Sequence, residues 1–178
     1  MTRGNFYQRV SLFYYLRKEN IMEQNQPDTI AAIASPKGLG GVGVIRISGA
    51  EALGVLRSIY ADKRHAVNNG VNDPVRPTEP KTFISHKLTH GFIINWFKGH
   101  IIDEVMVVYM QAPATYTGED TVEVYTHGGV AVMQNVLEVI LNNGARLAEP
   151  GEYTNRAFLN GKLALAEAEA GADLINAE

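Results

Sequence analysis

The chain has 178 residues, a formal net charge of −3 at pH 7, 46% hydrophobic residues and 20% charged residues. This composition is typical of a globular domain and excludes a disordered, collagen-like or coiled-coil protein. The acidic balance gives no overall basic field for nucleic acid. The chain contains no cysteine, which excludes a disulfide framework, a thiolate zinc site and a cysteine nucleophile within it.

Residues 1–21 differ in charge from the rest of the chain. They carry four basic residues and one acidic residue, a net charge of +3, whereas the rest has twelve basic and 18 acidic residues, a net charge of −6. We expect residues 1–26 to be a disordered or non-native extension, with Met22 as the functional start. An Arg-rich mitochondrial transit peptide is the alternative interpretation. The longest apolar run, residues 105–110, is far too short to span a bilayer, so no membrane partner is expected.

The first predicted elements are two strands and a helix. Residues 29–34 and 42–47 are rich in β-branched and apolar residues, which predicts strands on either side of a break at 36–41. Ser48, followed three residues later by Glu51, matches a capping box with Ser48 as the N-cap. This pattern predicts a helix that runs to about Tyr60.

A loop and a strand hairpin are expected next. Residues 61–80 contain three prolines and predict a solvated loop. Residues 82–96 and 101–110 predict two strands joined around Lys98-Gly99. A loop over 111–120 and a strand over 121–126 follow.

The last third of the chain is predicted to be mainly helical. A helix is expected over 130–142, stopped by Gly144, and a short one over 154–159. Residues 163–177 are rich in Ala, Leu and Glu, which favour a helix strongly. The apolar face of this predicted helix is thin. We expect this helix to pack on a second chain or on a continuation beyond residue 178.

The order of elements predicts the fold class. Strands occur as antiparallel-type neighbours, which favours an α+β fold over a doubly wound α/β fold. We expect a mixed, mostly antiparallel sheet with helices packed on it over residues 27–150. Residues 151–178 would form a C-terminal helical segment.

Three glycine or histidine motifs have simple interpretations. Residues 38–43 match the pattern G-x-G-x-x-G. A dinucleotide-binding site needs a helix directly after this pattern, whereas a strand is predicted here, so we interpret the glycines as a tight turn. His86 and His90 would share a strand face but fix no third ligand, so surface histidines are preferred to a metal site. The His127-Gly128-Gly129 motif fits a ligand contact beside a helix N-terminus and a close turn equally well.

Three charged residues stand out from their surroundings. Arg46 interrupts an apolar strand, Glu123 lies in a strand between two valines, and Lys162 follows a Gly turn. Each alone fits a solvated surface or a structural ion pair. Together they offer two cations that can bind the carboxylate of a ligand, and one carboxylate that can accept two parallel N–H bonds. This combination would suit a pterin ring with an anionic tail.

Several motifs occur in one order along the chain: DTIA at 28–31, GGVGVIRISG at 40–49, YTGED at 116–120, HGG at 127–129, PGEYTNRAFLNGK at 150–162, AEAEA at 166–170 and DLI at 173–175. Over about residues 27–178 the chain resembles the N-terminal part of the MnmE (TrmE) family of tRNA modification GTPases. The resemblance implies an α+β domain that forms a homodimer and binds 5-formyltetrahydrofolate or a related reduced folate, similar to the folate domains of aminomethyltransferases. The family's folate-contacting arginine, glutamate and lysine fall on Arg46, Glu123 and Lys162.

The resemblance also implies properties of a longer protein. In this family a helical domain follows, with an inserted GTPase domain that binds GTP, Mg²⁺ and K⁺. With a flavin-dependent partner protein, the cytoplasmic enzyme builds the carboxymethylaminomethyl group on wobble uridine of certain tRNAs. This chain contains no phosphate loop and no C-terminal cysteine motif. We therefore expect residues 151–178 to begin a truncated helical domain and the chain alone to be inactive, with no catalytic residue and no metal site assigned.

The chain departs from the family pattern at Ala164 and Glu167, where an aspartate and a glutamine are common. We expect these changes to alter helix packing more than ligand binding. Two other interpretations stay open: a structural dimerisation domain whose folate site has decayed, and a stand-alone one-carbon enzyme of the aminomethyltransferase type.

Overall fold

The computed structural model describes residues 28–36, 40–62, 81–164 and 166–168. In these residues seven strands form one sheet with the order β3-β4-β5-β6-β2-β1-β7. The strands are β1 (Ile30–Ile33), β2 (Val42–Ser48), β3 (Tyr60–Ala61), β4 (Lys87–Asn95), β5 (His100–Met110), β6 (Thr121–His127) and β7 (Arg146–Leu147). The helices are α2 (Ala52–Ile59), α4 (Val130–Asn142) and α5 (Glu152–Leu159).

The predicted α+β class is confirmed. Five of the strand pairs are antiparallel, and only β1 and β7 pair in parallel. The short strands β3 and β7 extend the two ends of the sheet and were not predicted. Within the described residues no helix is long and apolar enough to cross a membrane.

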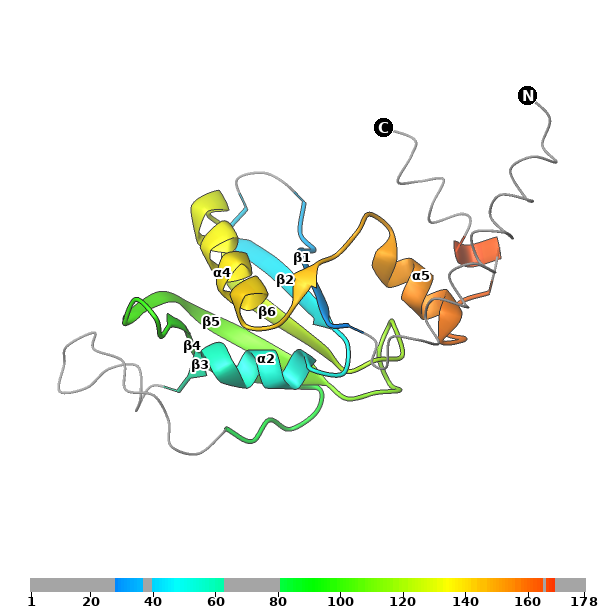
Figure 1. The fold of residues 1–178 in the computed structure, drawn as a ribbon, viewed down its shortest axis with the longest axis horizontal. Helices are drawn as coiled ribbons and strands as arrows, with labels where there is room; N and C mark the ends of the chain where they lie inside the picture. The colour runs from blue at the N-terminus through cyan, green and yellow to red at the C-terminus, as the bar shows by residue number, and fades with distance from the viewer. Residues whose placement is uncertain (1–27, 37–39, 63–80, 165, 169–178) are drawn as a thin grey trace, which may run out of the picture.

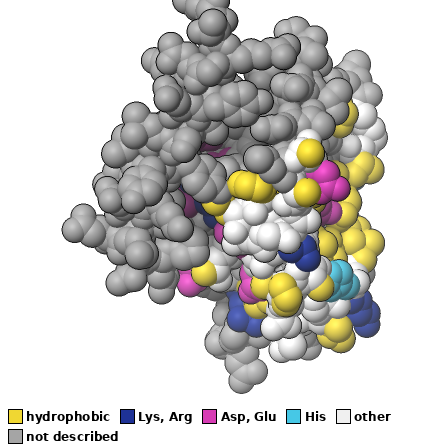
Figure 2. Space-filling model, turned by 90° about the vertical axis from the view of Figure 1, so that its right-hand side faces the viewer, with side chains coloured by type: hydrophobic (Ala, Val, Ile, Leu, Met, Phe, Trp, Pro, Cys, Tyr) yellow, Lys and Arg dark blue, Asp and Glu magenta, His cyan; other side chains and the backbone are white. Residues whose placement is uncertain are grey.

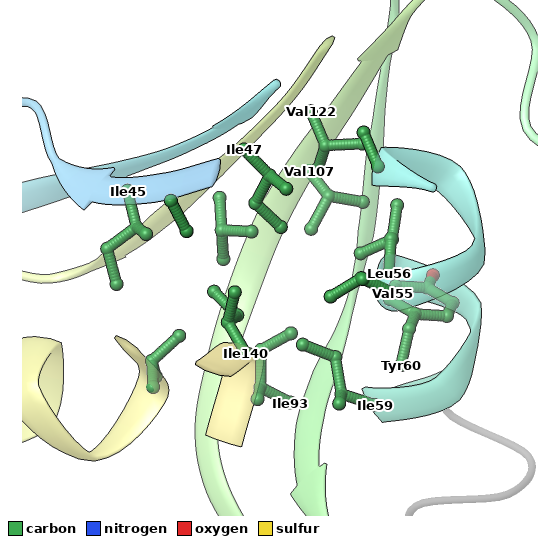
Figure 3. Close-up of a cluster of buried hydrophobic side chains, with 14 of the residues drawn as sticks. Ile45, Ile47, Val55, Leu56, Ile59, Tyr60, Ile93, Val107, Val122 and Ile140 are labelled. Carbon is green, nitrogen blue, oxygen red and sulfur yellow. The ribbon is translucent and has the colours of Figure 1, made fainter. Parts of the chain in front are cut away.

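Both α2 and α4 lie against the same face of the sheet, and α5 lies beyond them at one end of the molecule (Figure 1). Every second residue of the central strands points toward these two helices, because side chains alternate across a strand. Figure 3 shows the core where Ile47, Val107 and Val122 of the sheet meet Leu56 of α2 and Ile140 of α4, all fully buried. Burial of each such side chain contributes about 1.5–3 kcal/mol to folding.

The predicted capping box is wrong. Ser48 remains in β2, paired with Ile30 and Thr121, and Gly49 turns the chain with a φ of 135°. The helix begins only at Ala52, and the N-cap residue Glu51 makes no side-chain capping bond. The backbone N–H of Glu51 itself donates to the Thr29 hydroxyl at 3.0 Å.

The other boundaries differ at two places. Strand β4 begins at Lys87 rather than at residue 82, because His86 adopts a φ of 62°, a turn conformation that a strand does not contain. Helix α5 begins at Glu152, after Gly151 in the left-handed region, and not at residue 154. The predictions for 1–26, for most of the 61–80 loop and for most of the 163–177 helix concern residues outside those described.

A network of five charged side chains joins α5 to the sheet and to the 111–120 loop: Asp28, Glu119, Arg146, Glu152 and Arg156. Arg156 lies at its centre with only 10% of its side chain exposed. Its Nη2 donates to Asp28 Oδ1 at 2.7 Å and to Glu152 Oε1 at 3.1 Å, and its Nη1 lies 3.2 Å from both Glu119 oxygens. Arg146 hydrogen-bonds to Asp28 and Glu152 from the other side.

We expect acid to weaken this network before it affects the apolar core. Burial alone would raise the pKa of Glu152, but hydrogen bonds from Arg146, the Glu149 backbone N–H and Arg156 lower it to about 2 from 4.5. Its stabilising effect is therefore complete above about pH 4.5 and is lost as the pH falls toward about 2. Hydrogen bonding to Arg146 lowers the pKa of Asp28 too, so both carboxylates act in the same direction.

Urea denaturation at a series of pH values from about 6 to about 2.5 measures this dependence. The wild-type midpoint should fall steeply at the acid end, and a Glu152→Gln variant should show a flatter profile from a lower starting value. Equal slopes in the two proteins would contradict the assignment to Glu152.

Candidate functional site

The sheet face opposite α2 and α4 carries two rows of side chains, which we call the open face. Strand register aligns the rows across the sheet: Ala32, Arg46, Glu123, Val108 and Leu88 in one, and Val44, Tyr125, Met106 and His90 in the other. Most of these side chains are half-buried, and Leu88 is 51% exposed. The open face is therefore mixed, with apolar side chains around a charged pair at the middle of the first row.

Arg46 and Glu123 form that pair. The register aligns Arg46 of β2 directly opposite Glu123 of β6. Arg46 donates from Nε at 2.9 Å and from Nη2 at 2.7 Å to Glu123 Oε1. The two side chains are 30% and 15% exposed. The structure thus brings together two of the three predicted site residues, as a charge-assisted ion pair on a half-buried surface.

Two tyrosines, which were not predicted as site residues, contact this pair. The Tyr125 hydroxyl donates to Glu123 Oε2 at 2.6 Å, and this bond together with burial raises the pKa of Tyr125 to about 12. Tyr153 of α5 donates its hydroxyl to the Arg46 carbonyl at 2.7 Å, and its ring centroid lies 5.8 Å from the Arg46 guanidinium carbon. Burial raises the pKa of Tyr153. Both tyrosines are therefore protonated donors at neutral pH.

Lys162 lies beside the 111–120 loop. Its Nζ donates to the Pro113 carbonyl at 3.0 Å, and the side chain is exposed. Gly118 permits this approach, because a Cβ there would lie only 3.3 Å from Lys162 Cγ. Gly118 also has a φ of 76°, which favours glycine. Among the described residues no hydrogen bond or ion pair joins Lys162 to Arg46 or Glu123. The third predicted site residue is therefore a separate, exposed cation.

The 111–120 loop is fixed to the end of β2 by buried hydroxyl groups. Ser48 Oγ lies 2.7 Å from Thr117 Oγ1 and donates to Glu119 Oε2 at 2.8 Å. Asn160, two residues before Lys162, donates to the Thr117 carbonyl at 2.7 Å. These contacts hold the segment that carries Lys162 against the same strand that carries Arg46.

The histidine and glycine motifs resolve into local contacts. His86 binds Ser85 Oγ and the Ala114 carbonyl, whereas His90 pairs with Glu104. In the part of the chain that the structure describes, no three His, Cys, Asp or Glu residues gather as a metal site would require. Gly128 lies directly on the Gly40 carbonyl, and a Cβ there would come within 1.7 Å of that oxygen. Gly128 therefore makes a close backbone approach that requires glycine.

The fold and the open face define an α+β domain with an Arg–Glu ion pair on a half-buried sheet surface. Residues 29–162 match the family model described as GTP-binding protein TrmE N-terminus. The chain belongs to this family and corresponds to the N-terminal domain of the tRNA modification GTPase MnmE.

Two relatives give the extent of the similarity. The chain is 48% identical over 151 residues to the tRNA modification GTPase MnmE of Finegoldia magna, covering 85% of this chain and 30% of the relative. It is 47% identical over 157 residues to the protein of the same name from Streptococcus mutans, covering 88% and 31%. The chain thus spans about 30% of the length of these relatives.

Proposed function

We propose that this domain binds a reduced folate of the 5-formyltetrahydrofolate type on its open face. The observation that carries the proposal is the Arg46–Glu123 pair, in which the Tyr125 hydroxyl donates to Glu123 Oε2. A pterin ring presents adjacent N–H donors, and a carboxylate with one hydrogen bond on Oε2 retains lone pairs for further donors. Arg46 and Tyr125 hold Glu123 in one orientation, which reduces the entropy lost when a ligand binds.

The anionic tail of the folate requires a cation that has no carboxylate partner. Arg46 is occupied by Glu123, whereas the Lys162 ammonium is exposed and bonded to a neutral carbonyl. We therefore assign Arg46 to orienting Glu123 and Lys162 to attracting the tail. The residues present fit the group, because donor, acceptor and cation are all supplied by this chain.

We also infer that the domain forms a homodimer through the open face. Its two rows include the exposed side chain of Leu88 and the half-buried apolar side chains of Val44, Met106 and Val108. On the side of the molecule that carries α5, apolar side chains gather along one edge of the described surface (Figure 2). Contiguous apolar surface of this kind is typical of protein interfaces.

For the longer protein, we propose formation of the carboxymethylaminomethyl group on wobble uridine of tRNA, with GTP, Mg²⁺ and K⁺ bound by a separate GTPase domain. A flavin-dependent protein would be the partner, in the cytoplasm. The support is the name that the relatives carry, tRNA modification GTPase MnmE. The sequence of 178 residues contains no phosphate loop, so no GTP hydrolysis is assigned to it.

Calorimetric titration of 5-formyltetrahydrofolate into wild type and a Glu123→Ala variant tests the folate assignment. Loss of Glu123 should leave the ring's donors unpaired and weaken binding by roughly 1–3 kcal/mol, about tenfold or more. Glu104→Ala is the matched control, because Glu104 is an exposed carboxylate of the neighbouring strand that also has a single ion-pair partner. Its affinity should equal that of wild type.

Equal affinities of Glu123→Ala and wild type would overturn the role of Glu123. A folded wild-type dimer that gives no heat with the ligand would support the alternative of a structural dimerisation domain without a working folate site. Circular dichroism of each variant confirms that the comparison is between folded proteins.

A further inference from the structure

Tyr153 of α5 reaches from that helix to the strand that carries Arg46, and the function proposed above gives it no role. Its hydroxyl donates to the Arg46 carbonyl at 2.7 Å, and the centroid of its ring lies 5.8 Å from the Arg46 guanidinium carbon. The tyrosine is half-buried. One side chain of α5 therefore contacts both the backbone and the charged group of Arg46.

Arg46 has a second contact of this kind only with Glu123. Its Nε and Nη2 both donate to Glu123 Oε1, and among the described residues no hydrogen bond is made by Nη1. An ion pair in which the arginine is 30% exposed is weak on its own, because water and the rotamer entropy of arginine compete with it. The face of an aromatic ring attracts a cation and restricts where the guanidinium lies. Glu123 and Tyr153 thus hold Arg46 through two separate contacts.

The position of Tyr153 is itself fixed by the charged network that docks α5. Glu152, the preceding residue, is 8% exposed and pairs with both Arg146 and Arg156. The ion pairs that hold this turn of the helix against the sheet therefore also place the tyrosine beside Arg46. A supporting residue that is rigid in this way reduces the entropy that a ligand site loses on binding.

We propose that Tyr153 is a positioning residue of the folate site: its ring and hydroxyl hold Arg46 against Glu123, so that the Glu123 carboxylate is oriented before the pterin N–H donors reach it. The inference rests on the folate function proposed above. Tyr153 acts through Arg46 and not on the ligand itself. Because it belongs to α5, docking of this helix and binding of the ligand are linked, and each stabilises the other.

Calorimetric titration of 5-formyltetrahydrofolate into the full chain compares wild type with Tyr153→Leu and Tyr153→Phe. Leucine removes the ring and the hydroxyl and should weaken binding about tenfold, the size expected for one cation–ring contact and one hydrogen bond. Phenylalanine keeps the ring and should recover part of the lost affinity. Tyr116→Leu is the matched control, because the Tyr116 hydroxyl lies 3.1 Å from Thr154 Oγ1 of the same helix and should leave the affinity unchanged.

A double-mutant cycle separates positioning from a general effect on the fold. In a Glu123→Ala background Arg46 has lost its carboxylate partner, so Tyr153→Leu should weaken binding by less than about twofold further. A tyrosine that only stabilises the fold would weaken binding by the same factor in both backgrounds. Equal factors in the two backgrounds, or wild-type affinity of Tyr153→Leu, would overturn the role of Tyr153.

Hydrogen exchange of the wild-type chain keeps the proposal falsifiable even if Tyr153→Leu fails to fold. The backbone N–H groups of residues 156–159 lie within α5 and exchange when that helix opens. Saturating 5-formyltetrahydrofolate should slow this exchange by up to about tenfold, since the form with α5 detached would bind about tenfold more weakly. Rates that the bound ligand leaves unchanged would overturn the role of Tyr153 while the folate proposal stands. Absence of any folate binding by folded wild type would overturn both.

Discussion

Replacing Arg156 by alanine is expected to lower the free energy of unfolding by about 3–5 kcal/mol, the range found when one partner of a buried ion pair is removed. Arg156 is 10% exposed and bonds to Asp28, Glu119 and Glu152. Its loss leaves three carboxylates close together without their central cation. Since small domains are stable by only about 5–15 kcal/mol, much of the variant should be unfolded at moderate temperature.

Urea denaturation followed by circular dichroism measures the difference. Arg57→Ala is the matched control, because Arg57 is an exposed arginine of α2 whose hydrogen bond to another described residue is a 3.3 Å contact with the Lys81 carbonyl. The control should lie within about 0.5 kcal/mol of wild type. A loss for Arg156→Ala no larger than that of the control would show that the network is structurally dispensable.

Replacing Leu88 by aspartate should weaken the proposed dimer by about 2 kcal/mol or more, about thirtyfold or more in affinity. Leu88 ends the row that contains Glu123 and is 51% exposed, so a charge there costs little in the monomer. In the dimer the new carboxylate would be buried in an apolar interface. Sedimentation over a range of micromolar concentrations gives the dissociation constant.

Val130→Asp provides the comparison for this experiment. Val130 is 53% exposed and begins α4, on the other side of the sheet, so both substitutions put a carboxylate in place of a similarly exposed apolar side chain, but on different faces. The Val130 variant should dimerise like wild type. Equal weakening by both substitutions, or by neither, would contradict an interface on the open face.

The fold was largely predictable because local patterns and tertiary structure agree in the long elements. The helix over 130–142 was predicted with its observed bounds, since its apolar spacing matches the core that Val136 and Ile140 enter. The capping box at Ser48 was not reliable, because Ser48 continues a strand ladder and finds partners in Thr117 and Glu119. These partners are about 70 residues distant in the chain, so no local pattern contains them.

The site was predictable only in part. Arg46 and Glu123 were identified by their charge in apolar strands, and strand pairing brings them together. Tyr125 was within reach of sequence reasoning, because alternation places it on the same strand side as Glu123. The Asp103–His127 contact could not be predicted from the sequence, because it depends on how β5 and β6 diverge at their ends. The position of the Lys162 side chain depends on its turn and on its contacts with the 111–120 loop, and the spacing of residues in the sequence reveals neither.

The central claim is that a reduced folate binds at Arg46 and Glu123, and titration of the ¹⁵N-labelled chain with 5-formyltetrahydrofolate tests it most directly. Amide signals of Arg46, Glu123 and Tyr125 should shift in a saturable manner, with the side-chain Nε–H signal of Arg46 shifting too. Signals of α2, such as that of Leu56 on the opposite face, should stay in place. Saturable shifts confined to residues away from β2 and β6, or no shifts in the folded protein, would contradict the account.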